Sequence, residues 1–109
     1  MIKVILIGAL GKMGRSVMKA AFQSKDIEIV AVVEGENNPF AGKKLSLAVP
    51  ESELSLTVST NIVQAMSRGD VVIDFSNPES SMNCLKVANQ KELPVVIGTT
   101  GFKKAHYDL

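Results

Sequence analysis

Short apolar runs alternate with amphipathic stretches along the chain. The runs cover residues 2–7, 27–33, 71–75 and 93–97. Continuous runs of this kind, rich in β-branched residues, are typical of strands that are buried on both faces of a parallel sheet. Leu54, Leu56 and Val58 instead alternate with less apolar residues, which predicts a short strand with one exposed face.

Three helices are predicted between these strands. The first shows residues at helical spacing after the first strand: Val17, Ala20, Ala21 and Ser24. Asn61 can cap a second, short helix that runs to about residue 68, and Gln64 stands where a capping-box partner would stand. A third helix, to about residue 90, begins with Asn77-Pro78-Glu79, which supplies a cap, a proline in the first turn and an acidic residue.

The alternation of strands and helices predicts an α/β fold. Crossovers between parallel strands are right-handed and place helices on both faces of the sheet, so we expect a doubly wound parallel sheet of the Rossmann-like kind. One segment, residues 35–50, breaks the alternation with Asn, Pro, Gly and paired Lys residues. We interpret it as a long and mobile surface excursion.

Composition excludes several classes of protein. A chain of 109 residues suits one domain, here residues 1–109. A net charge of +1, with no basic tract longer than a pair, argues against binding nucleic acid or an anionic membrane, and no apolar run suits a signal peptide or a membrane span. One Cys cannot form an internal disulfide, which favours a cytoplasmic protein, and one His with one Cys cannot build a zinc site.

A glycine-rich turn follows the first predicted strand. Gly8, Gly11 and Gly14 lead directly into the first helix, whose unpaired amides and dipole favour an anion. Glu34 ends the second strand, where a doubly wound sheet presents a carboxylate to the adenosine ribose of a dinucleotide. Taken singly, the glycines also suit an ordinary tight turn, and Glu34 suits a solvated loop. Together they predict a dinucleotide site.

Glu34 also bears on the choice of cofactor. A carboxylate at this position repels the 2′-phosphate of NADPH, and the next residue, Gly35, offers no cation. Lys12, Lys43 or Lys44 could reach a 2′-phosphate, although lysines in such places are commonly solvated. The cofactor is therefore expected to be NAD(P)H, with NADH favoured.

Three motifs in order along the chain resemble the signatures of 4-hydroxy-tetrahydrodipicolinate (dihydrodipicolinate) reductases. They are GALGKMGR at 8–15, VIDFSNPE at 72–79 and VIGTTGF at 96–102. The resemblance implies an oxidoreductase that uses NADH or NADPH to reduce 4-hydroxy-tetrahydrodipicolinate to tetrahydrodipicolinate, in diaminopimelate and lysine biosynthesis.

The same resemblance implies a set of cofactor-binding residues. The pyrophosphate and the adenosine edge would be held by Gly8, Ala9, Leu10, Gly11, Lys12 and Met13, and the ribose by Glu34. The nicotinamide side would be lined by Gly98, Thr99 and Thr100, with Phe75 and Ser76 nearby. No catalytic residue and no metal ligand is predicted.

Members of this family carry a second, substrate-binding domain with a paired-histidine stretch, which has no match here. We therefore expect a fragment of a two-domain reductase that binds the cofactor but does not catalyse alone. The small-molecule substrate and the contacts of the family's homotetramer would belong to the absent part, and His106 is expected to face solvent. Two other interpretations stay open: a non-catalytic NAD(H)-sensing domain, and the N-terminal half of another NAD(P)-dependent dehydrogenase.

Two further residues are predicted to be structural. Cys84 shares a helical face with Ser81, Leu85 and Ala88, which indicates a small buried residue rather than a reactive thiol. Asp74 ends a buried strand near the predicted cofactor site. Strand-end acids commonly accept bonds from backbone amides, so it is assigned no chemistry. The helical methionines Met13, Met18 and Met82 are expected to pack.

Overall fold

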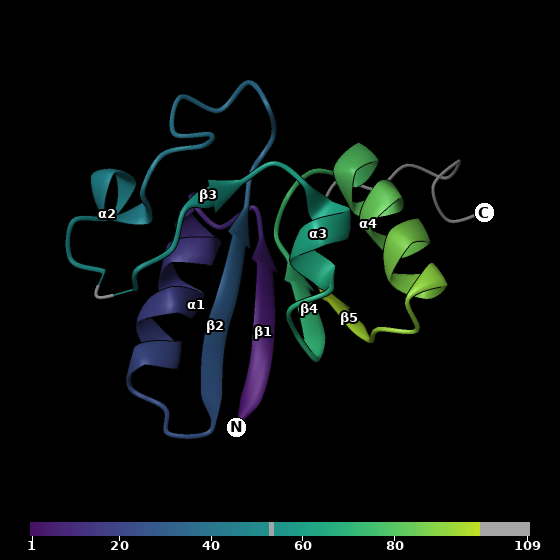
Figure 1. The fold of residues 1–109 in the computed structure, drawn as a ribbon, viewed down its shortest axis with the longest axis horizontal. Coiled ribbons are helices and arrows are strands. Elements are labelled where there is room, and N and C mark those ends of the chain that lie inside the picture. Colours follow the sequence, from purple (N-terminus) through teal and green to yellow (C-terminus); the bar gives the residue numbers. More distant parts are fainter. Residues whose placement is uncertain (53, 99–109) are drawn as a thin grey trace.

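A computed structural model describes residues 1–52 and 54–98 and contains a five-stranded sheet (Figure 1). The strands are β1 (Ile2–Ile7), β2 (Ile27–Val33), β3 (Val58–Ser59), β4 (Val71–Asp74) and β5 (Val95–Ile97). They lie in the order β3-β2-β1-β4-β5, and every neighbouring pair is parallel. The chain thus moves outward from β1 first on one side and then on the other, as the predicted doubly wound α/β fold requires.

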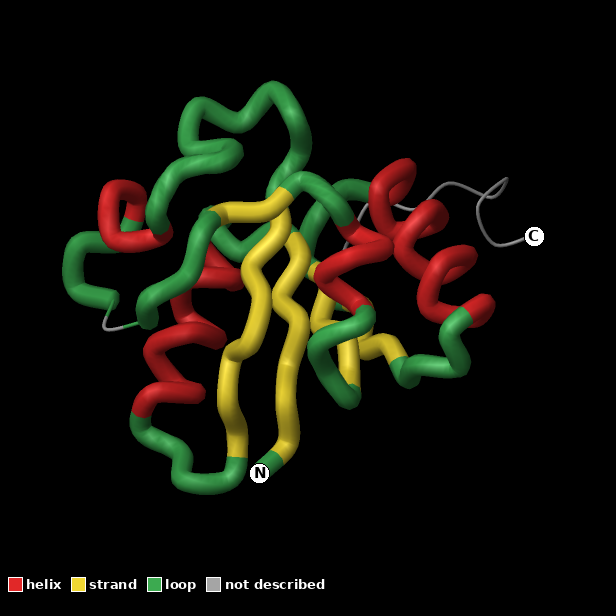
Figure 2. The backbone as a smooth tube through the Cα atoms, in the orientation of Figure 1, coloured by secondary structure: helices red, strands yellow, loops and turns green. Residues whose placement is uncertain are grey.

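Helices cover both faces of this sheet, as Figures 1 and 2 show. The helices are α1 (Lys12–Phe22), α2 (Leu45–Ala48), α3 (Ile62–Met66) and α4 (Pro78–Gln90). Residues of α1 and α2 pack in one hydrophobic cluster, and residues of α3 and α4 pack in the other. The fold class predicted from the alternation of elements is confirmed.

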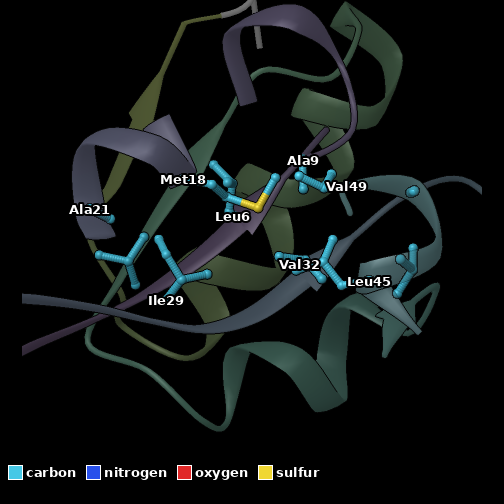
Figure 3. Packing of buried hydrophobic residues seen from close by; sticks show 11 residues of the cluster. Leu6, Ala9, Met18, Ala21, Ile29, Val32, Leu45 and Val49 are labelled. Carbon is cyan, nitrogen blue, oxygen red and sulfur yellow. The ribbon is translucent and has the colours of Figure 1, made fainter. Parts of the chain in front are cut away.

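The central strand β1 supplies both clusters. Its side chains alternate between the two faces, so Leu6 packs with α1 while Ile5 packs with α3 and α4. Figure 3 shows Leu6 in the first cluster beside Met18 of α1, with Leu45 farther along the same face. Leu6 and Ile5 are both fully buried, and burial of such a side chain contributes about 1.5–3 kcal/mol. The fold is therefore anchored on the strand that leads into the glycine-rich turn.

The interpretation of residues 35–50 as a surface excursion is wrong in part. Leu45, Ala48 and Val49 are buried in the first cluster, and the Leu45 N–H donates to the Leu56 carbonyl at 2.8 Å. The sequence interpretation relied on the Asn, Pro and Gly residues of this stretch, which indicate a loop, and gave too little weight to its apolar residues. A stretch with few apolar residues can still pack against the core when those residues lie on one side of a short helix.

The buried face of α1 also differs from the expected one. The helix begins at Lys12, inside the glycine motif, and buries Gly14, Met18 and Ala21. Ala20 is exposed and Ser24 lies beyond the end of the helix. The glycine-rich turn lies so close to α1 that only a residue without a side chain fits at position 14. A glycine therefore occupies a buried helix position where the sequence pattern would ordinarily show an apolar residue. Of the helical methionines, Met18 packs in the core while Met13 is exposed.

The helix caps follow the sequence closely. Asn77 accepts a hydrogen bond from the Ser80 N–H at 2.9 Å, and Asn61 accepts one from the Gln64 N–H at 3.0 Å. The predicted capping box does not close, because the Asn61 N–H donates to Ser59 Oγ instead. Among the described residues, no helix is long and apolar enough to span a membrane.

Candidate functional site

A cleft opens at the carboxyl ends of β1, β2 and β4. The strand order reverses at β1, and ligands of open α/β sheets bind at such a switch point. The cleft has a volume of about 620 Å³, within the range of small-molecule and cofactor sites. Predicted site residues on its wall are Gly8, Gly11, Glu34, Phe75 and Ser76. The structure therefore brings the glycine-rich turn, the end of β2 and the turn after β4 to one cavity, whereas Gly98 is not on its wall.

The three glycines of the first turn have different roles. Gly8 has φ +73°, and a Cβ there would lie 2.7 Å from the Phe75 carbonyl carbon and the Ser76 nitrogen. A Cβ on Gly14 would lie 2.5 Å from the carbonyl oxygens of Gly8 and Ala9. Both positions are fixed by close packing of backbone. A Cβ on Gly11 would meet only the Gly8 carbonyl oxygen, at 3.6 Å, so Gly11 borders open space in the cleft.

The N-terminus of α1 follows this open position. Gly11 is the N-cap residue, and it offers no side chain to bond the amides of the first turn. An uncapped helix N-terminus beside a cleft provides N–H donors and a positive dipole end for an anion. Lys12 and Met13 begin the helix with exposed side chains, whereas Ala9 is buried in the core beneath the turn.

Glu34 lies against the glycine-rich turn. Its Oε2 accepts a hydrogen bond from the Leu10 N–H at 2.6 Å, across 24 residues of chain. The Glu34 N–H itself donates to the Ser59 carbonyl at 2.9 Å, which ties the end of β2 to β3. The carboxylate is thus fixed at the cleft wall, where the sequence placed it. The amide of Leu10, one of the predicted binding residues, is used in this internal contact.

Arg15, the last residue of the first motif, has a bracing role that the sequence did not reveal. Its Nε donates to the Leu10 carbonyl at 2.8 Å, and its guanidinium also donates to the Ala48 carbonyl at 3.1 Å. The side chain therefore joins the glycine-rich turn to α2. No local pattern indicates this, because Ala48 is 33 residues away.

The opposite wall of the cleft is the turn after β4. Asp74 is fully buried, and its Oδ1 accepts both the N–H of Ser76, at 2.8 Å, and its hydroxyl, at 2.5 Å. The expectation that Asp74 binds a backbone amide is confirmed. The Asp-x-Ser spacing is the sequence signal for such a turn, but it does not reveal the second bond or the burial.

Cys84 of α4 lies behind Asp74. The thiol is fully buried, and burial raises its pKa to about 12, together with the negative charge of Asp74 and a hydrogen bond to it. The thiol therefore stays protonated at neutral pH, and the prediction of a buried rather than a reactive cysteine is confirmed. Ser81 and Ala88 share the buried face, whereas Leu85, which was expected on it, is exposed.

Gly98 follows β5 and contacts the same turn. Its N–H donates to the Asp74 carbonyl at 2.8 Å, and a Cβ there would overlap the ring of Phe75. The Phe75 ring therefore packs directly on Gly98. Thr99, Thr100 and His106 lie outside the described residues.

The charge of the cleft is carried by carboxylates. Its wall contains Glu34, Glu36 and Glu79. Among the described residues, no lysine or arginine lies on this wall. Lys12, Lys43 and Lys44 are not on its wall. Within residues 1–52 and 54–98 there is also no group of three or more His, Cys, Asp or Glu residues that could hold a metal ion.

Comparison with known proteins assigns the family. The family model described as "Dihydrodipicolinate reductase, N-terminus" matches residues 2–109. The chain belongs to this family. Its resemblance to the reductases, drawn from three motifs, is thereby confirmed across nearly the whole sequence.

Relatives within the dihydrodipicolinate reductase family are longer than this chain. The 4-hydroxy-tetrahydrodipicolinate reductase of Bartonella tribocorum is 37% identical over 94% of the chain and 38% of the relative. That of Dictyoglomus turgidum is 38% identical over 93% of the chain and 37% of the relative. The chain thus spans about two fifths of the length of the curated relatives it matches.

Solved structures agree with the family and the fold. A dipicolinate-bound dihydrodipicolinate reductase from Paenisporosarcina superposes with a TM-score of 0.72 at 26% identity, covering 99% of this chain and 41% of the other. An aspartate semialdehyde dehydrogenase with NADP from Candida albicans reaches a TM-score of 0.76 at 20% identity, covering 92% and 30%. The second likeness shows a shared fold alone.

Proposed function

We propose that this chain is the NAD(P)H-binding part of a dihydrodipicolinate reductase. The observation that carries the proposal is the Glu34 carboxylate held against the glycine-rich turn by the Leu10 N–H, at 2.6 Å, on the wall of a 620 Å³ cleft. A carboxylate at the end of β2 accepts the ribose hydroxyls of a dinucleotide. The nearby uncapped N-terminus of α1 accepts the pyrophosphate.

The cofactor then extends from Glu34 across the cleft. Its pyrophosphate is held by backbone amides of the turn and of the first residues of α1, with Gly11 leaving the approach open. The nicotinamide end reaches Gly98 and the turn of Phe75 and Ser76. When bound, the cofactor supplies the hydride, while the residues of this chain bind and orient it.

NADH is the preferred cofactor in this proposal. A 2′-phosphate would lie beside Glu34, whose carboxylate can move away only by breaking a short, charge-assisted hydrogen bond. Gly35 has no side chain to offer, and Glu36 adds a second carboxylate to the same wall. No described lysine or arginine lines the cleft to offset them.

The reduction itself is assigned to the longer protein. The relatives carry the name 4-hydroxy-tetrahydrodipicolinate reductase, and this chain spans about two fifths of their length. We assign the substrate contacts and the proton donor to the part that this chain does not span. The chain alone therefore binds the cofactor and turns over no substrate. A reductase assay of the chain alone against the full-length protein tests this assignment.

The cofactor assignment is tested by titrating the full-length protein with NADH and NADPH and following the fluorescence of the nicotinamide. Glu34→Ala is expected to weaken NADH roughly 10-fold or more, because a hydrogen bond to a charged group is worth about 1.5–3 kcal/mol. NADPH should change by no more than about twofold. The matched control is Glu28→Ala, an exposed carboxylate near the other end of the same strand.

Three outcomes separate the claims. Selective loss of NADH affinity supports the role of Glu34. An equal loss of affinity for NADH and NADPH contradicts that role but leaves the cleft as the proposed binding site. Failure of the folded wild-type protein to bind either cofactor at millimolar concentration contradicts the proposed function itself.

A further inference from the structure

A buried carboxylate stands behind the wall of the cleft formed by the β4 turn. Asp74 is fully buried, yet it lies one residue from Phe75 and two from Ser76, which both line the cleft. Its Oδ1 accepts two bonds from Ser76, one from the N–H and one from the hydroxyl. A carboxylate removed from water is tolerated when such bonds satisfy it. It cannot touch a ligand in the cleft, so any effect on binding must pass through its neighbours.

The backbone of Asp74 connects three strand ends. In the sheet, Asp74 pairs with Ile7 of β1 and with Ile97 of β5. Its carbonyl accepts the Gly98 N–H at 2.8 Å, and the next amide, of Phe75, donates to the Ile7 carbonyl at 2.9 Å. The residue therefore lies between the glycine-rich turn that follows β1 and the turn that follows β5.

Phe75 fills the space between those two turns. A Cβ on Gly8 would contact the Phe75 backbone at 2.7 Å, and a Cβ on Gly98 would overlap the Phe75 ring. Since even one added carbon would clash on either side, the Phe75 residue packs closely between the two glycines. The bonds that Ser76 makes to Asp74 fix the turn together with the backbone bonds of Asp74 and Phe75.

The surroundings of Asp74 hold its carboxylate in one orientation. Ser81 of α4 is fully buried, and its hydroxyl lies 3.5 Å from the hydroxyl of Ser76. The Cys84 thiol, also from α4, forms a hydrogen bond to the same carboxylate. Side chains of α4 thus support the β4 turn from behind, which preorganises the wall that faces the ligand.

We propose that Asp74 is a positioning residue that acts through Ser76 and Phe75 to shape the nicotinamide half of the cofactor cleft. The proposal rests on the proposed function, in which Glu34 receives the adenosine ribose and the opposite end of the cofactor reaches β4 and β5. Asp74 makes no contact with the cofactor. It sets the position of the side chains that do.

The experiment compares NADH with ADP-ribose, which keeps the adenosine, the pyrophosphate and the second ribose but lacks the nicotinamide ring. Dissociation constants are measured on the full-length protein for wild type, Asp74→Ala and Ser76→Ala. We expect Ser76→Ala to weaken NADH about 3- to 10-fold, from the loss of one hydrogen bond, and Asp74→Ala to weaken it further. ADP-ribose should stay within about twofold. The fluorescence spectrum of bound NADH should also shift in both variants.

Ser67→Ala serves as the matched control, because Ser67 is an exposed serine whose hydroxyl donates to the Gln64 carbonyl of its own helix end and is not on the wall of the cleft. Because Ser76 itself lines the cleft, the variants of Asp74 decide the question. Asp74→Asn replaces Asp74→Ala if the latter does not fold. Its amide oxygen keeps one acceptor for Ser76, so NADH should weaken selectively but by less than in Ser76→Ala. Equal weakening of NADH and ADP-ribose, or no weakening of either, overturns the positioning role. If wild type binds neither molecule, the proposed function fails instead, so the two failures are distinguishable.

Discussion

The two walls of the cleft each contain a carboxylate at a strand end that accepts a backbone N–H, yet they work in opposite ways. Glu34 is half-buried, lines the cleft and reaches a partner 24 residues away. Asp74 is fully buried and binds a partner two residues away. The first carboxylate is presented to the cleft, and the second lies behind the wall of the cleft.

In the proposed function, this difference in exposure, rather than residue type or position in the strand, separates the binding carboxylate from the supporting one. Removing a carboxylate at the surface of the cleft leaves its partner amide to water, so the fold loses less. Removal of a buried one leaves donors unsatisfied inside the protein, which costs much more. Substitution of Asp74 should therefore mainly lower the stability of the fold, and substitution of Glu34 should mainly lower the affinity for the ligand.

The largest expected effect is the loss of stability in Asp74→Ala. We expect the free energy of unfolding to fall by about 3 kcal/mol, because the amide and hydroxyl of Ser76 lose their buried acceptor. Glu34→Ala should cost less, about 1 kcal/mol, because water can replace the carboxylate at the Leu10 N–H. Urea unfolding measures both. Asp70→Ala is the control, since exposed Asp70 also accepts a single backbone N–H, from Lys3 at 2.9 Å. Equal losses at Asp74 and Glu34 would contradict the distinction between the walls.

A smaller effect is expected from pH at the buried wall. The folded pKa of Cys84 is raised from 9.0 to about 12, so below pH 9 the thiol is protonated in both the folded and the unfolded states. Above pH 9 the unfolded chain loses its proton first, and stability falls by about 1.4 kcal/mol per pH unit until the folded pKa is reached.

This contribution is isolated by subtracting the pH dependence of Cys84→Ala, in which other groups titrate as before. Between pH 8.5 and pH 10 the wild-type protein should lose about 1 kcal/mol more than the variant. Asp74→Asn, which removes the neighbouring charge, should reduce this difference. Parallel curves for wild type and Cys84→Ala would show that the thiol ionises freely in the folded protein.

Much of the fold follows from local sequence. Continuous apolar runs identify β1, β2, β4 and β5, and the caps at Asn61 and Asn77 mark where helices start. These features depend on neighbours in the chain. The docking of Leu45 and Val49 into the core does not, because it depends on the space that α1 and β2 leave on one face of the sheet.

The site divides in the same way. The glycines and Glu34 could be predicted because a parallel sheet brings the ends of its strands to one edge. The bracing of the glycine-rich turn by Arg15 and the burial of Asp74 beneath Ser76 could not be predicted, since both depend on contacts between elements. The sequence indicated which residues lie near the cleft, but not which of them face it.

Backbone amide chemical shifts of the full-length protein, recorded while NADH is added, test the central claim most directly. We predict the largest changes at Gly8, Gly11, Lys12 and Met13, with further changes at Ser76, because these amides line or adjoin the cleft. Shifts confined to the opposite end of the strands, at residues 24–26 and 69–70 before β2 and β4, would contradict the account. So would an unchanged spectrum at saturating NADH.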